Sequence, residues 1–128
     1  MKKLLLFTCL GIASLAAKAQ ITSQRWQATI DIPSPTDCFI SFDHDSLNLF
    51  MKDMPTDIVE SMRFTLSNDT LTLVKLMGGS PCDSEPVTYK ATVADNKLQL
   101  TKINDACDVR VNALVTQPWK PYTTAAAQ

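Results

Sequence analysis

The chain has 128 residues, 12 basic and 13 acidic, and a formal net charge of -1. This length provides for one domain with a hydrophobic core and excludes two. The charge balance also excludes the basic stripe with which nucleic-acid-binding proteins neutralise phosphates.

The first 19 residues have the pattern of a cleavable export signal. Lys2 and Lys3 form a charged start, an apolar run covers residues 4–17, and Ala17-Lys18-Ala19 is a small-x-small cleavage site. The run is shorter than the roughly 20 apolar residues of a membrane-spanning helix. We therefore expect cleavage after Ala19 and a secreted or periplasmic domain comprising residues 20–128.

Removing the signal takes away Lys2, Lys3 and Lys18, so 9 of the 12 basic residues remain against 13 acidic ones, a net charge of -4. This net negative charge argues against a nucleic-acid partner. No second apolar run has membrane length, so no integral membrane segment is expected in the domain.

Alternating apolar and polar residues predict three strands at the start of the domain. They cover residues 25–32, residues 37–42 after a break at Pro33-Ser34-Pro35, and residues 47–51. Residues 43–45 are expected to form a turn. Residues 52–57, with a proline and three charges, are expected to form a loop. We expect Asp53, Asp57 and Glu60 to be the charged face of a loop at a barrel mouth.

Two hairpins are predicted in the second half. Residues 60–66 and 70–77 flank the turn residues Ser67-Asn68-Asp69, and residues 87–93 and 98–100 flank Ala94-Asp95-Asn96. Between the hairpins, residues 78–81 form a flexible connection. Residues 104–116 fit either a strand or a helix by periodicity, and we favour a short helix capped by Asp105. Residues 119–122 are expected to be a last edge strand or closing segment.

These elements predict an all-β fold, a small antiparallel barrel of about eight strands with one short helix near the C-terminus. A closed meander is favoured over a sandwich because closure removes exposed strand edges. Such a barrel encloses either packed side chains or one small ligand. The inward candidates are bulky, which favours a small or absent cavity; they are Trp26, Ile30, Ile40, Phe42, Leu49, Phe64, Leu73, Tyr89, Val93 and Leu100.

Three cysteines lie in the expected domain, so three single-bridge pairings are open and one thiol remains. We favour Cys82 with Cys107, which closes a loop of about 25 residues and contributes about 3–4 kcal/mol. Cys38 is either a buried apolar residue of its strand or an exposed thiol that pairs between molecules, and its alternation favours burial. With His44 as the sole histidine and no Cys-x-x-Cys pattern, we expect no metal site and no cofactor.

The second half of the chain resembles the small lipocalin-like domains of exported bacterial proteins. The residues that carry the resemblance run over about 40 positions: Cys82, Tyr89 in a strand, Leu98-x-Leu100, Asp105-x-Cys107-x-x-Arg110, Leu114 and Trp119. The resemblance implies an eight-stranded barrel with Cys82 and Cys107 bridged. It also implies that Arg110 stacks on Trp26 at the barrel base, a contact of about 0.5–2 kcal/mol. The first strand departs from the family's Gly-x-Trp with Gln24-Arg25-Trp26.

No residue pattern predicts an enzyme. His44, between Asp43 and Asp45, is expected in a solvated turn, and the serines lack a nucleophile-elbow pattern. The lipocalin-like resemblance implies a binding module for a small hydrophobic molecule. Methionines at positions 51, 54, 62 and 77 are candidates for a pocket lining or for ordinary core packing. The alternative is a solid barrel that acts as a structural or interaction protein of the cell envelope, similar in size and strand rhythm to the stress-related META-type domains.

Overall fold

The computed structural model describes residues 18–123. The predicted export signal lies mostly outside the described residues, so the signal and its cleavage stay predictions. Residues 18–22 are helical. Ile21, which lies just after the expected cleavage site, is buried in the core, and its carbonyl accepts a hydrogen bond of 2.9 Å from the Trp26 indole.

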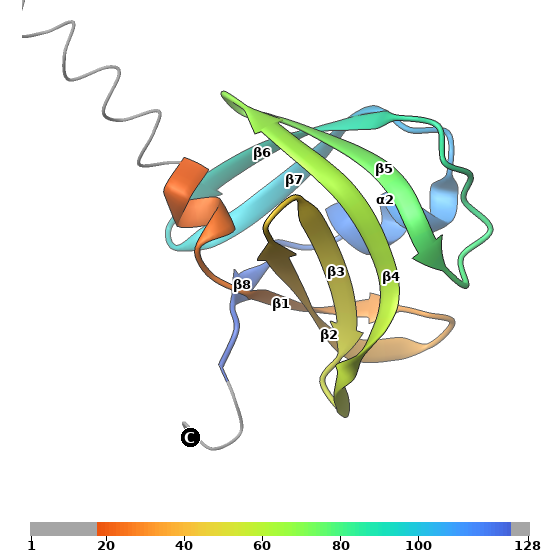
Figure 1. Cartoon of the computed structure of the whole chain (residues 1–128). Helices are drawn as coiled ribbons and strands as arrows, with labels where there is room; N and C mark the ends of the chain where they lie inside the picture. The colour runs from red at the N-terminus through yellow and green to blue at the C-terminus, as the bar shows by residue number, and fades with distance from the viewer. Residues whose placement is uncertain (1–17, 124–128) are drawn as a thin grey trace, which may run out of the picture.

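Eight antiparallel strands form one sheet that curls into a nearly closed barrel (Figure 1). Each strand pairs with the next one along the chain, and the last strand returns to the first, giving the order β7-β6-β5-β4-β3-β2-β1-β8. The strands are β1 (Trp26–Asp31), β2 (Pro35–Asp43), β3 (Ser46–Met51), β4 (Met54–Ser67), β5 (Thr70–Gly78), β6 (Val87–Ala94), β7 (Lys97–Asn104) and β8 (Lys120–Pro121). The predicted all-β, eight-stranded meander is confirmed.

The segment before and within β8 joins the two ends of the sheet. Lys120 and Pro121 pair with the start of β1. One residue earlier, Trp119 forms a bridge with Leu98 of β7, in which each amide donates to the other carbonyl at 2.8 Å. The predicted closing segment is therefore confirmed, and it brings a fully buried tryptophan to the seam of the barrel.

Three tight turns lie where the sequence predicts them. His44, Asn68, Asp95 and Asn96 have φ angles of 54–59° in these turns. Asn, Asp and His are the residues that tolerate this left-handed conformation best after glycine. Successive positive φ angles at Asp95 and Asn96 match the hairpin turn that follows the right-handed twist of its strands.

The predicted loop at residues 52–57 is wrong. β3 and β4 are joined by Lys52 and Asp53 alone, and β4 already begins at Met54. Register shifts around Phe50 make room for the residues near Pro55, because a bulge accommodates a proline that cannot donate to the ladder. The predicted break before the second strand is also too long, since β2 begins at Pro35; the first position of a strand is one that proline can occupy.

A helix of about two turns, α2 (Asp108–Val115), follows β7 and confirms the predicted short helix. It contacts β7 and β1 and lies over one end of the barrel (Figure 1). Its N-cap residue is Cys107, which makes no side-chain capping bond, so the predicted cap at Asp105 is wrong. The Asp105 carboxylate instead forms a buried ion pair with Arg110. Within residues 18–123, no helix is long and apolar enough to cross a membrane.

The predicted inward residues all belong to the core. Seven are buried, and the other three (Phe42, Leu49 and Val93) are partly buried and pack against them. The largest fully buried side chains are Trp26, Trp119 and Tyr89. Burial of each large apolar side chain contributes roughly 1.5–3 kcal/mol, so the inward residues of the alternating strands stabilise the barrel.

Candidate functional site

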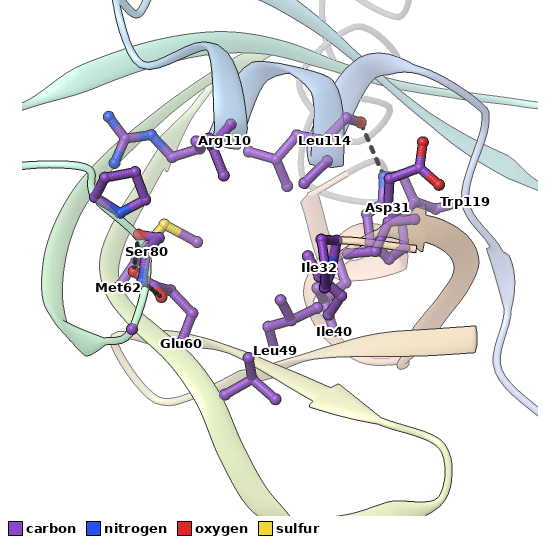
Figure 2. A pocket seen from close by; sticks show the side chains of 17 residues that line it. Asp31, Ile32, Ile40, Leu49, Glu60, Met62, Ser80, Arg110, Leu114 and Trp119 are labelled. Atoms are coloured by element: carbon purple, nitrogen blue, oxygen red, sulfur yellow. Dashed lines mark hydrogen bonds between the residues drawn. The ribbon is translucent and has the colours of Figure 1, made fainter. Parts of the chain in front are cut away.

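An apolar cavity of about 470 Å³ lies between the end of the barrel and α2 (Figure 2). Ligand pockets in proteins typically enclose about 300–1,000 Å³. Its lining comes from five parts of the fold: the β1–β2 hairpin (Ile30, Asp31, Ile32, Pro33 and Ile40), the β3–β4 hairpin (Leu49, Val59, Glu60 and Met62), the β5–β6 connection (Gly79, Ser80 and Pro81), α2 (Val109, Arg110, Ala113 and Leu114), and Trp119.

This cavity contradicts the expectation that bulky inward residues leave little or no space. The cavity lies between inward side chains of β1 to β4 on one side and α2 with the β5–β6 connection on the other. Figure 2 shows Leu49 and Ile40 on one side of the open space and Arg110 and Leu114 of α2 on the other. The space therefore arises from tertiary packing of the helix, which the strand pattern does not encode.

Most of the wall surface that faces the cavity is apolar. The Trp119 indole nitrogen donates to the Leu114 carbonyl at 3.0 Å, so the ring presents its apolar face (Figure 2). Of the candidate methionines, Met62 lines the cavity, Met51 is partly buried and packs against the core, and Met54 and Met77 are exposed. Only one methionine therefore fits the predicted pocket lining.

One wall contains a buried ion pair between Glu60 of β4 and Lys75 of β5. Their charged atoms lie 3.2 Å apart, and both side chains are about nine-tenths buried. Ser80 joins them: its hydroxyl donates to Glu60 Oε1 at 2.7 Å and its carbonyl accepts from Lys75 Nζ at 2.7 Å. The predicted charged loop face is therefore wrong for Glu60, whose carboxylate holds the β5–β6 connection against the barrel.

Gly78 makes the space that the Glu60 carboxylate occupies. It pairs with Glu60 across β4 and β5 and has a φ of 140°. A Cβ at this position would lie 2.0 Å from Glu60 Oε2, a distance at which the side chain must move.

We expect Gly78→Ala to lower the free energy of unfolding by about 1–3 kcal/mol, through backbone strain and displacement of the Glu60 carboxylate. Urea denaturation checks this change. Gly79→Ala is the matched control, because nothing lies within 4 Å of a Cβ built there. An equal loss of unfolding free energy in both variants would show that the close contact of Gly78 with Glu60 does not affect stability.

A second buried ion pair anchors α2. Arg110 donates from Nε to Asp105 Oδ2 at 2.6 Å and from Nη2 to Oδ1 at 2.9 Å. The Tyr89 hydroxyl and the Cys107 amide also donate to this carboxylate. Burial alone would raise the pKa of Asp105, but the hydrogen bonds from Arg110, Tyr89 and Cys107 outweigh it and hold that pKa below its ordinary value. Burial, followed by the bond to Asp105, raises the pKa of Tyr89.

This pair gives Arg110 a different partner from the one that the resemblance implies. Trp26 and Arg110 are both buried, at 0% and 8% exposure. The cations over aromatic rings in residues 18–123 are Arg25 and Lys52, and a stack of Arg110 on Trp26 is not among these contacts. Arg110 instead fixes α2 to β6 through Asp105 and Tyr89.

The predicted Cys82–Cys107 disulfide is present, with Cα atoms 5.7 Å apart. It links the β5–β6 connection to the residue that precedes α2, and the connection and α2 both contribute to the cavity wall. Cys38 is buried and free, as its alternation predicts. Burial, with a smaller effect of Asp37, raises the pKa of the Cys38 thiol to about 11.

The other candidate residues lie in solvent. His44 is in the β2–β3 turn, where its side chain is 94% exposed beside an exposed Asp43 carboxylate at 3.7 Å. Across the part of the chain that the structure describes, no three His, Cys, Asp or Glu side chains gather as a metal site would require.

Compared with protein-family models, curated proteins and solved structures, the chain matches none of them. The lipocalin-like resemblance therefore stays a prediction, and the candidate site rests on its own geometry.

Proposed function

We propose that the domain is a binding module that holds a small hydrophobic molecule in the cavity between the barrel and α2. The observation that carries this proposal is the combination of a 470 Å³ volume with an apolar lining. Binding of an apolar guest in such a cavity is favourable, because it removes apolar surface from water at roughly 25 cal/mol per Å². The proposed role requires no catalytic group.

One disulfide and two ion pairs support a preformed site. The disulfide and the Asp105–Arg110 pair hold α2, and the Glu60–Lys75 pair holds the β5–β6 connection. A preformed cavity spends little binding free energy on ordering its walls. A disulfide also fits an oxidising compartment, and we propose export to the periplasm or the exterior as the setting for this binding.

The test is titration with N-phenyl-1-naphthylamine, an uncharged probe whose fluorescence rises in apolar surroundings. We expect saturable binding by the wild-type domain, with a change in the emission of Trp119, which lines the cavity. Ala113→Phe places a ring from α2 into the space and is expected to weaken binding at least roughly tenfold, equivalent to about 1.4 kcal/mol.

Ala94→Phe is the matched control, because Ala94 is exposed at the end of β6 and does not line the cavity. This variant should bind the probe as the wild type does. Two results would contradict the proposal: no saturable binding by the wild type, or unchanged binding by a folded Ala113→Phe variant.

A further inference from the structure

The charged groups that line the cavity are Asp31, Glu60 and Arg110. The Arg110 guanidinium is held by both oxygens of Asp105, and the Glu60 carboxylate is paired with Lys75. Asp31, at the exposed end of β1, forms no ion pair with any residue in the range 18–123. Counted with their ionic partners, these groups give the cavity one unbalanced negative charge.

This arrangement disfavours an anionic guest. Arg110 is the one cation among the described lining residues, and its charge is already balanced by Asp105. A guest carboxylate in the cavity would lose its hydration without gaining a free cation, which is costly for any charged group. The unbalanced charge of Asp31 would add repulsion.

The same wall offers an acceptor for a hydrogen-bond donor. Glu60 Oε1 lies 3.2 Å from the Lys75 ammonium and accepts a hydrogen bond from the Ser80 hydroxyl. Its other oxygen, Oε2, accepts one long bond of 3.3 Å, from the Ser80 amide. An ionised carboxylate has about four acceptor positions, so Glu60 retains capacity for a further donor.

We propose that the guest is an apolar molecule whose polar group is a hydrogen-bond donor, a hydroxyl or an ammonium, and that Glu60 accepts from it. Fatty acids and other anions with an apolar tail are not expected as guests of this cavity. This inference rests on the proposed function of the same cavity and specifies the chemistry of its ligand.

The experiment compares decanol, decylamine and decanoate, which share a chain length and differ in head group, as competitors of N-phenyl-1-naphthylamine at pH 7. We expect decanol and decylamine to displace the probe at concentrations at least about tenfold lower than decanoate. In Asp31→Asn, the ratio between the displacing concentrations of decanoate and decylamine should fall by about two- to fivefold, as expected when an exposed charge is removed. Asp95→Asn, in the β6–β7 turn away from the cavity, is the control and should leave the order and the ratio unchanged.

Glu60→Gln provides a second arm, because it leaves Lys75 as an unpaired cation beside the cavity. In this variant decanoate should gain affinity relative to decylamine. If that variant does not fold, the Asp31→Asn comparison decides alone. Decanoate that competes as well as decanol with the wild type would overturn the inference while the proposed binding function stands. A probe that fails to bind the wild type, or binds Ala113→Phe equally, would remove the proposed function itself.

Discussion

Asp105→Asn is expected to lower the free energy of unfolding by about 3–5 kcal/mol, the usual loss when one partner of a buried ion pair is removed. The Asp105 side chain is fully buried and that of Arg110 is 8% exposed, so the guanidinium would stay in the interior without a counter-charge. The Tyr89 hydroxyl would also lose a charged acceptor. Urea denaturation at pH 7 measures the change.

The matched control is Asp69→Asn, which breaks the exposed pair with Lys90, whose charged atoms are 3.9 Å apart. Exposed pairs contribute between about 0 and 1 kcal/mol, so this variant should remain close to the wild type. If Asp105→Asn changes stability no more than Asp69→Asn does, the buried pair does not anchor α2.

The same carboxylate gives stability a dependence on pH. Because the pKa of Asp105 is lower in the folded protein than in the unfolded chain, its contribution is fully present above the unfolded pKa of about 3.9. The contribution is lost as the pH falls through the folded pKa. The free energy of unfolding of the wild type should therefore fall more steeply below about pH 5 than that of Asp105→Asn.

Replacing both Cys82 and Cys107 by serine is the second change with a large expected effect. The bridge joins residues 25 positions apart, and a loop of this size corresponds to about 3–4 kcal/mol on the chain-entropy model. Affinity for N-phenyl-1-naphthylamine should also fall, because the bridge joins two parts of the cavity wall. Thermal denaturation and probe titration of the double variant measure both effects.

Alkylation without reductant is the control for this bridge. Native protein should take up no label, since Cys38 is buried and its pKa is raised to about 11. The denatured, unreduced domain of residues 20–128 should take up one label, at Cys38. A label on Cys82 or Cys107 would show that the two sulfurs are not bonded in the protein.

Local sequence patterns predict most of this fold because its strands pair with their neighbours along the chain. The alternation in residues 87–100 depends on one buried face, and the turn at Asp95-Asn96 depends on the conformations that these residues tolerate. The extent of β4 was not predictable in this way, because the register shifts around Phe50 that accommodate Pro55 depend on the partner strand.

The candidate site was less predictable because it depends on groups far apart in the sequence. Glu60 contacts Lys75 and Ser80 only after β4 and β5 pair. The sequence around Glu60 is charged, and a buried and a solvent-exposed glutamate have the same pattern there. Asp105 has the pattern of a helix cap, and its ion pair with Arg110 depends on the burial of both side chains. The cavity depends on how far α2 lies from the barrel end.

Native mass spectrometry of the exported domain tests the binding account most directly. The domain, purified from its own host without reductant, is measured before and after addition of decanol, and Ala113→Phe is measured in parallel. We predict one bound small molecule per wild-type domain, lost on denaturation, and none in Ala113→Phe. A wild-type domain that carries no guest and takes up none would contradict the account, and would favour a barrel that acts through its outer surface.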